Sequence, residues 1–301
     1  HMKNLKTVSL ALVFMTFFLG MFITNDAVLI TLIPLTIIIF KSIHQEKHII
    51  LVLILQTIAA NLGSAFTPMG DPQNIYLFTL FDLSFFEFVS IMFPVSLLGF
   101  ILLAVTSYAF IPTQKVETIG YDAYFKSYKP VYYIIVFICT VLAIVNILPY
   151  YFVLFGVVFT FVFVDVKVIK RVDFFLIGTF VCFFIISGNI ILLDSINAFF
   201  ERSLTSGARV YFVSLGLSQV ISNVPTAVLL SPFIDTAHIK DLLHGVNVGA
   251  MGTMVASLAS LISLKYIRNE FPNLVIKYII TYTLLCIIYV VIISIVLFVI
   301  G

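Results

Sequence analysis

The chain has 301 residues, of which 62% are hydrophobic and 10% are charged, and its formal net charge is +2. Its mean hydropathy of +1.20 excludes a soluble globular domain, in which about half of the residues are apolar and about a quarter are charged. The apolar residues form long separate runs, whereas a membrane barrel would show short alternating segments. The small net charge gives no reason to expect a nucleic-acid partner. The composition therefore predicts an all-α integral membrane protein.

The apolar runs, taken in chain order, differ in length, and this difference predicts their roles. A spanning helix needs about 20 residues, and a run of about 10–14 residues is more typical of a re-entrant or broken piece. Short runs that adjoin across a polar break are therefore paired. The predicted re-entrant hairpins cover residues 7–40 and 209–234, and the predicted broken transmembrane helices cover 49–81 and 238–264. The predicted ordinary spans cover 85–110, three runs within 130–193, and 274–300.

The basic residues test this path through the membrane. If hairpins return to their own side and broken helices cross, 13 of the 16 Lys and Arg residues fall on the face of the N-terminus. The three on the other face are Arg202, Arg209 and Lys240. An excess of Lys and Arg marks the cytoplasmic side, so the N-terminus is expected in the cytoplasm. Two full spans in place of one hairpin would give the same distribution. Residues 194–207 are expected outside, as an amphipathic helix along the interface.

An internal repeat relates the two halves of the chain. TNDAVLITLIP (24–34) aligns without gaps with SNVPTAVLLSP (222–232), and NLGSAFT (61–67) aligns with NVGAMGT (247–253). The first hairpin enters from the cytoplasm and the second from outside, so the halves are inverted, as in many secondary transporters. The first repeat covers 1–112, a cytoplasmic linker covers 113–129, and the second repeat covers 130–301. The first repeat has no counterpart of the spans in 130–193, because N-terminal spans are missing or because the protein is naturally minimal.

The four predicted breaks carry the polar residues of the membrane region. Irregular backbone at membrane depth occurs where protein or a water-filled cavity satisfies its polar groups. The helix ends at such breaks offer N–H groups to an anion and C=O groups to a cation. Asn25, Asn61, Asn223 and Asn247 each add a donor and an acceptor, and glycines at 63, 70, 249 and 252 allow close backbone approach or positive φ. The alternative for each single break is an ordinary kink.

Two acidic residues lie in the first-half breaks. A carboxylate inside a membrane is costly and by default marks an ion or proton path, so Asp26 and Asp71, with Asn74, are predicted to bind a coupling ion or proton. A cap on the following helix is the structural alternative. The repeat places Val224 and Ser257 at the matching positions, and no Lys or Arg lies at any break. The three cysteines have no metal or redox spacing, so no metal beyond Na⁺ and no cofactor are expected.

Four stretches resemble the ion transporter superfamily, which includes arsenite-efflux permeases, citrate and dicarboxylate symporters, and some sodium/proton antiporters. They are ITNDAVLITLIPLTI (23–37), ANLGSAFTPMGDPQNI (60–75), LSQVISNVPTAVLLSPF (217–233) and GVNVGAMGTMVASLASLIS (245–263). The likeness is greatest to the bacterial anion-permease branch, which is similar to arsenical pump membrane proteins. The resemblance implies an elevator-like transporter that forms a homodimer. For a member of the arsenical branch, a separate ATPase subunit is a further possible partner. The implied substrate-binding residues are Thr24, Asn25, Asn61, Gly63, Ser222, Asn223, Asn247, Gly249 and Thr253.

The sequence thus favours a secondary active transporter for a small anion or oxyanion, coupled to H⁺ or Na⁺, in the plasma membrane of a bacterium. A sodium/proton antiporter is the first alternative, with Asp26 and Asp71 exchanging ion and proton. A passive channel and an intramembrane aspartyl protease are remote alternatives, and the Gly-x-Gly-Asp context of such a protease is absent. The chain also lacks HExxH, Gly-x-Ser-x-Gly and P-loop motifs, so it is not expected to be an enzyme.

Overall fold

The computed structural model describes residues 4–116, 129–144, 147–164, 174–190 and 192–300, and the secondary structure of these residues is helical, without a strand. The chain is an all-α membrane protein, as its composition predicts. Two compact units divide it: unit 1 contains residues 1–119 and 187–301, and unit 2 contains residues 120–186.

Unit 1 holds both predicted hairpins and both predicted broken helices. From the first half it contains α1 (Leu5–Gly20), α2 (Asn25–Ser42), η1 (Glu46–His48), α3 (Ile49–Ser64), η2 (Pro68–Gly70), α4 (Pro72–Leu80) and α5 (Phe85–Phe110). From the second half it contains α9 (Asp194–Ser203), α10 (Gly207–Ile221), α11 (Asn223–Leu230), η5 (Ser231–Phe233), η6 (Thr236–His238), α12 (Ile239–Val248), α13 (Leu258–Glu270), η7 (Pro272–Leu274) and α14 (Val275–Ile300).

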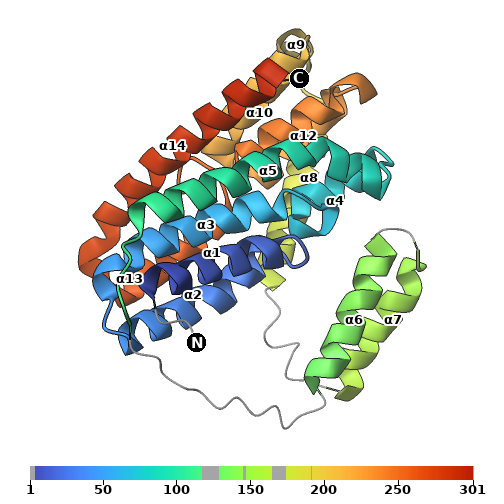
Figure 1. Cartoon of the computed structure of the whole chain (residues 1–301). Coiled ribbons are helices and arrows are strands. Elements are labelled where there is room, and N and C mark those ends of the chain that lie inside the picture. Colours follow the sequence, from blue (N-terminus) through green and yellow to red (C-terminus); the bar gives the residue numbers. More distant parts are fainter. Residues whose placement is uncertain (1–3, 117–128, 145–146, 165–173, 191, 301) are drawn as a thin grey trace. The chain divides into compact units, whose positions relative to one another are not determined.

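Helix α3 forms the core of unit 1. It is apolar on all sides, which is typical of a helix surrounded by protein, and Leu51 is its one residue that is not fully buried. Helices α1, α2, α5, α13 and α14 all pack against it, and Figure 1 shows α1, α3, α5 and α14 as successive layers. The interrupted helix therefore lies inside the bundle, where its polar end must find protein partners.

The sequence explains both interruptions. Pro68 and Pro72 lack the N–H group that a continuous helix needs, and each stands at the first position of a new helix, η2 and α4. In the second half α12 ends at Val248 and α13 begins at Leu258, and between them Gly252 has φ +133°, a conformation that side chains rarely adopt. Both predicted interruptions are present, and the crossing of the membrane by the interrupted helices remains a prediction.

Helix length gives less support to the predicted hairpins. Helix α2 has 18 residues and α3 with its preceding turn has 19, because both include polar residues at their ends, so each is long enough to cross a membrane. The apolar runs 27–40 and 49–60 were predicted to be too short to span alone. That prediction was wrong for the helices that contain them. The helix–turn–helix arrangement itself is present in both places, α1 with α2 and α10 with α11. That these hairpins are re-entrant remains a prediction.

The two halves exchange contacts through their shorter helices. Helix α2 of the first hairpin packs on α13, and α11 of the second hairpin packs on α4. Lys41 and Glu270 form an ion pair of 2.7 Å between α2 and α13, and the Tyr76 and Ser231 hydroxyls lie 2.8 Å apart between α4 and η5. This reciprocal packing explains why one compact unit contains parts of both repeats.

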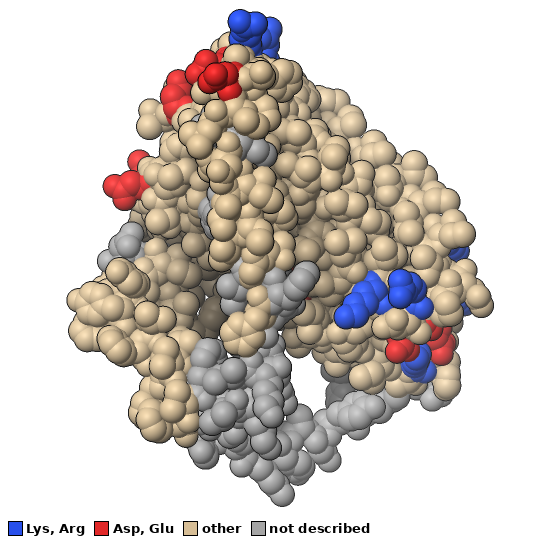
Figure 2. All heavy atoms as spheres, turned by 180° about the vertical axis from the view of Figure 1, so that it is seen from behind, with Lys and Arg blue, Asp and Glu red and all other residues tan. Residues whose placement is uncertain are grey.

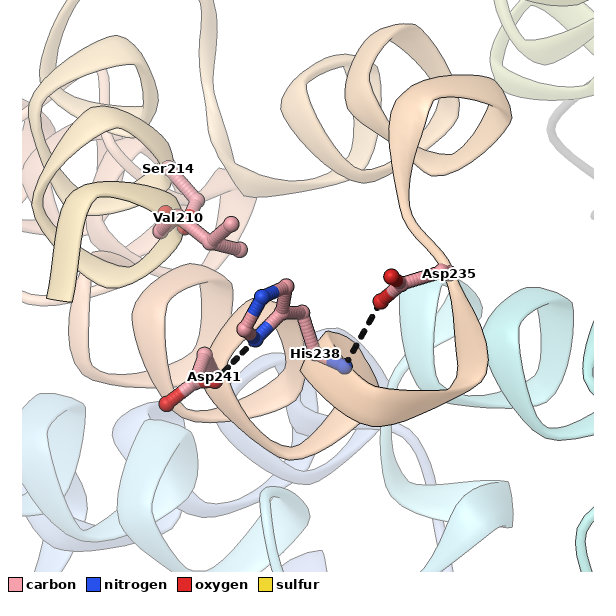
Figure 3. A network of polar contacts seen from close by, with 5 residues as sticks. All are labelled: Val210, Ser214, Asp235, His238 and Asp241. Carbon is pink, nitrogen blue, oxygen red and sulfur yellow. Dashed lines mark hydrogen bonds and ion pairs between the residues drawn. The ribbon is translucent and has the colours of Figure 1, made fainter. Parts of the chain in front are cut away.

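The connection from the second hairpin to α12 is held by two acids. Asp235 accepts a hydrogen bond of 3.2 Å from the backbone N–H of His238, and the His238 ring lies 3.3 Å from the Asp241 carboxylate (Figure 3). The Asp241 carboxylate also lies against Gly207 at the start of α10, where an added Cβ would stand 2.7 Å from its Cγ. These contacts fix the N-terminal end of α12 beside α10.

Unit 2 contains α6 (Lys129–Ile144), α7 (Tyr150–Phe159) with a π-helical turn (Thr160–Val164), and most of α8 (Phe174–Ile190). The Tyr132 and Thr160 hydroxyls lie 2.9 Å apart and join α6 to the end of α7. The three predicted spans thus correspond to helices, and their crossing of the membrane remains a prediction. Of the predicted linker, residues 117–128 lie outside the described residues.

The outer surface of unit 1 is apolar. Helices α5 and α14 are bounded within one residue as predicted, and both are long and apolar enough to span. Large apolar side chains project from them, including Phe86 (83% exposed) and Ile276 (73% exposed). Figure 2 shows a wide surface of unit 1 without Lys, Arg, Asp or Glu, and charged groups at its ends. This surface suits contact with lipid.

Gly63→Ala is expected to destabilise the fold, since an added Cβ would overlap the Phe17 carbonyl group, 2.8 Å from its carbon, where α3 crosses α1. Overpacking of this kind costs about 1–3 kcal/mol. Gly216→Ala is the control, because that glycine lies in α10 with nothing within 4 Å of its Cβ position and alanine favours helix. Thermal unfolding in detergent should show a lower midpoint for the first variant only; equal midpoints would contradict the close crossing.

Candidate functional site

The tip of the first hairpin and both helix breaks meet at Asn61. The Asn61 side-chain oxygen accepts hydrogen bonds from Asn25 Nδ2 (3.2 Å) and from Ser257 Oγ (3.0 Å). Asn25 begins α2, Asn61 lies in the last turn of α3, and Ser257 precedes α13. The two halves of the chain therefore share one buried polar centre.

Asp71 joins this centre through Ser64. The Ser64 hydroxyl donates to Asp71 Oδ2 at 2.7 Å, and Asp71 is 2% exposed. Asp71 directly precedes α4, yet its side chain makes no capping hydrogen bond among the described residues. Asp71 thus occupies the N-cap position of α4 without the side-chain bond that a cap would make. Its carboxylate is directed toward the end of α3.

Asp26 lies in the first turn of α2, where a negative charge is favourable. Its Oδ1 atom is buried and has no hydrogen-bond partner among the residues that the structure describes. Asp26 directly follows Asn25, which bonds Asn61, and Asp71 bonds Ser64 in the same last turn of α3. Both acids predicted from sequence therefore lie by the end of α3.

Asn74 connects the first break to α12. Its amide donates to the carbonyls of Ser64 (3.1 Å) and Thr67 (3.4 Å), which satisfies irregular backbone of the break. Its Oδ1 atom accepts from Asn247 Nδ2 at 2.8 Å, and Gln73 donates to Asn247 Oδ1 at 3.3 Å. Asn247 therefore pairs with α4 of the other half, and not directly with Asn61.

The tip of the second hairpin binds the backbone of the second break. The Asn223 N–H and the Ser222 hydroxyl both donate to the Ala256 carbonyl, at 3.0 and 3.2 Å. Ser222 has φ 75° and ψ 158°, a conformation that is almost restricted to glycine and costs about 1–3 kcal/mol. A strained residue thus stands at a predicted substrate-binding position.

Gln219 holds the second break against α10. Its Nε2 atom donates to the Gly249 (2.7 Å) and Met251 (3.1 Å) carbonyls, and its Oε1 atom accepts from the Thr253 N–H at 2.9 Å. An added Cβ on Gly252 would overlap the amide of Gln219, 2.9 Å from its Cδ atom. Glycine is therefore required at 252 for both conformation and space.

One hydrogen bond recurs in both halves. Thr67 Oγ1 donates to the Met21 carbonyl, and Thr253 Oγ1 donates to the Gln219 carbonyl. Thr67 and Thr253 are 186 residues apart, and Met21 and Gln219 are 198 residues apart, which are the offsets of the two repeated motifs. In each half the hairpin tip is thereby tied to the break of its own repeat.

A close backbone contact recurs in the same way. The Cβ position of Gly63 lies within 3.0 Å of Phe17 backbone atoms, and that of Gly249 lies 3.0 Å from the Leu215 Cα. Gly63 matches Gly249, and Phe17 matches Leu215, at the same two offsets. The sequence repeat is therefore a repeat of structure.

The centre is almost closed to solvent. Asn25, Asn61, Asp71, Asn223 and Asn247 are each at most 3% exposed, and Thr24, Asp26, Ser222 and Thr253 are partly exposed. Three buried polar atoms of the centre lack partners within the described part of the chain: Asn61 Nδ2, Gln73 Oε1 and Asp26 Oδ1. One is a donor and two are acceptors, so the centre can bind both an anionic and a cationic group.

Every residue that the sequence selected lies at this centre or in the backbone that shapes it. Four contributors were not selected: Ser64, Gln73, Gln219 and Ser257. Gln219 lies within an apolar run, where an amide is expected to bond between helices, and in the structure it bonds the backbone of the second break. Ser257 was visible only as the repeat partner of Asp71, and both residues directly precede a helix.

Interrupted helices around a buried polar centre are typical of secondary transporters, and the fold and site define a multi-pass membrane transporter. The chain matches the citrate transporter family (CitMHS) over residues 2–244, and it belongs to that family.

Named relatives agree with this assignment. The chain is 33% identical over 283 residues to Uncharacterized transporter MJ0456 of Methanocaldococcus jannaschii, a match that covers 88% of the chain and 72% of that protein. It is 30% identical over 259 residues to Inner membrane protein YbiR of Escherichia coli, covering 84% and 67%. A second Methanocaldococcus jannaschii protein, Uncharacterized transporter MJ0672, is 26% identical over 271 residues, covering 82% and 60%.

Ser222→Gly is expected to be more stable than Ser222→Ala by about 1 kcal/mol or more, since only glycine adopts the Ser222 conformation without strain. Both variants lose the hydroxyl, so the difference between their stabilities reports the strain of the backbone at residue 222. Ser90 provides the matched control: it is exposed within α5, where alanine should exceed glycine by about 1 kcal/mol. Unfolding midpoints in detergent rank the glycine and alanine variants at each position. If alanine is more stable than glycine at both 222 and 90, Ser222 is unstrained.

Proposed function

We propose that this chain is a secondary active transporter that moves a small anion or oxyanion across the membrane together with H⁺ or Na⁺. The observation that carries the proposal is the convergence of the first hairpin tip and both helix breaks on Asn61, with the second hairpin tip bonded to Ala256 of the second break. Helix ends inside a membrane protein bind ions because their N–H and C=O groups are free.

The helix ends supply both signs of partial charge. Helices α2, α4, α11 and α13 begin at the centre, and α1, α3, α10 and α12 end there. Helix N-termini favour anions and helix C-termini favour cations. The unpartnered Asn61 Nδ2 donor supports an anion site beside these N-termini. The unpartnered Asp26 Oδ1 and Gln73 Oε1 acceptors support an adjacent cation or proton site.

The charges of the centre make coupling necessary. Asp26 and Asp71 are both acidic, and no Lys or Arg lies within the centre as far as the described residues extend. An anion placed beside ionised carboxylates in a medium of low dielectric would be strongly repelled. A proton or Na⁺ that binds first would remove this repulsion, so anion binding would depend on the cation. This dependence is the physical basis of symport.

The family name supports carboxylates such as citrate as the first substrates to test. The fourfold set of Asn25, Asn61, Asn223 and Asn247 also suits an oxyanion, since amide groups donate hydrogen bonds to oxygen without a fixed charge. A sodium/proton antiporter is the second candidate. The placement of Asp26 and Asp71 by the end of α3 supports it, because two acids at one site can exchange a proton for Na⁺.

Several finer points belong to the same proposal. Both hairpins and both broken helices lie in unit 1, which supports an elevator-like movement in which they travel together. The excess of Lys and Arg on the N-terminal face supports a cytoplasmic N-terminus and a plasma-membrane location. A homodimer is proposed from the family resemblance, and a separate ATPase partner is not required by the coupling scheme.

A thermal-shift screen identifies the substrate class. Arsenite, antimonite, citrate, dicarboxylates, phosphate and sulfate are each added with and without Na⁺ at two pH values. A transporter with a coupled anion site should be stabilised by one class of anion, and more so with Na⁺ or at lower pH. Stabilisation by Na⁺ and pH with no effect of any anion would favour the antiporter.

Asp26→Asn is expected to reduce gradient-driven uptake into proteoliposomes by about tenfold or more, since coupling free energies of about 1–3 kcal/mol correspond to such factors. The variant should still show a thermal shift with the anion, because the Asn25 and Asn61 amides remain. Asp82→Asn is the control, since Asp82 is an exposed acid beyond the end of α4. Uptake by Asp26→Asn that equals the wild type under pH and Na⁺ gradients would exclude the coupling role.

A further inference from the structure

A cavity of about 300 Å³ lies on unit 1, where α5 packs against α12 and α14. Its apolar wall comes from α5 and α14 and includes Phe93, Leu97, Leu98, Val296 and Leu297. Phe93 is 51% exposed and Leu97 is 43% exposed. Because α5 and α14 are apolar enough to span the membrane, the cavity opens toward hydrocarbon, and an occupant can enter it sideways from the bilayer.

The α12 side of this cavity is polar. Lys240 lies in the first turn of α12 and lines the cavity, and its side chain forms no ion pair with any described residue. The neighbouring acid, Asp241, does not neutralise it, because that carboxylate contacts His238 (Figure 3) and also lies against Gly207. The N-terminus of α12 adds further positive partial charge at the same place.

His244 forms the inner part of the polar side. It lies one turn below Lys240, is 4% exposed, and its Nε2 atom is 2.7 Å from the Ile91 carbonyl oxygen. A carbonyl oxygen only accepts, so Nε2 donates. This bond fixes α12 against α5 beside Pro94, which also lines the cavity. The wall is therefore held in place by helix–helix contacts and does not need an occupant to form.

The apolar wall and the unpaired Lys240 together indicate which molecule the cavity binds. An apolar slot open to the bilayer accepts an acyl chain, and an unneutralised Lys at a helix end attracts an anionic headgroup. We infer that this cavity binds an anionic phospholipid, with one acyl chain along α5 and α14 and the phosphate at Lys240. The site is separate from the polar centre and does not depend on which solute the protein transports.

A second cavity provides an internal comparison. It has a volume of about 220 Å³ and adjoins the first, because Phe93 and Leu97 border both. Phe17, Phe18 and Met21 of the first hairpin line the second cavity and not the first. No charged side chain among the described residues lines the second cavity. This second cavity should accept lipid chains without preference for the headgroup.

The absence of tryptophan from the sequence permits a direct test. Leu297→Trp places a single indole in the first cavity, and Phe18→Trp places one in the second; neither residue lines both. Each variant is reconstituted in phosphatidylcholine bilayers with increasing amounts of brominated phosphatidylglycerol or brominated phosphatidylcholine, and quenching of the indole reports occupancy. The anionic lipid should quench the Leu297→Trp variant with about fivefold higher apparent affinity, since one Lys near the surface contributes about 1 kcal/mol.

Lys240→Gln in the Leu297→Trp background should abolish this preference, and Phe18→Trp should show none. Native mass spectrometry of the wild type and Lys240→Gln, with both lipids at equal concentration, gives a readout that does not rely on the tryptophan substitution. Equal quenching of Leu297→Trp by the two lipids, or a preference that persists in Lys240→Gln, would overturn the inference.

Discussion

Backbone polar groups inside a membrane must find partners within the protein, and the structure of this transporter depends on that constraint. The chain interrupts two of its helical segments, at residues 65–71 and 249–257. Asn74 satisfies carbonyls of the first break, and Gln219 satisfies groups of the second. Each half also needs the other, since Ser257 of the second break bonds Asn61 of the first half. The breaks are stable because they meet.

The contact between the two breaks also forms the candidate site. Four helix starts and four helix ends gather with two acids and several amides in a place that water hardly reaches. Low dielectric strengthens every charge interaction there, so under the proposed function the free energy of binding an anion would depend strongly on whether Asp26 and Asp71 carry a proton or Na⁺. Membership of the citrate transporter family is consistent with this chemistry. The structural solution to irregular backbone and the proposed coupling of solute to cation are therefore two properties of one arrangement.

The sequence predicts those features that depend on local chemistry. Both breaks can be predicted from Pro68, Pro72 and Gly252. The bounds of α5 and α14 can be predicted from the lengths of their apolar runs. These features do not predict the extent of α2, whose polar ends belong to the helix and whose Lys41 pairs with Glu270 of α13. The residues of the candidate site were predicted as a set, since the repeat doubles the signal. Its pairings were not: Asn61 with Ser257, and Asn74 with Asn247, join residues 196 and 173 positions apart. The strain at Ser222 also has no local signature, because the Ala256 carbonyl supports it from another segment.

An experimental map of the chain in a lipid nanodisc, obtained by electron cryomicroscopy, tests the central claim most directly. The account predicts that α3 ends at Ser64 and α12 at Val248, that both breaks lie within the lipid belt, and that Asn61 is within hydrogen-bond distance of Asn25 and Ser257. Continuous helices through 65–71 and 249–257, or breaks that lie outside the lipid belt and apart from each other, would contradict it.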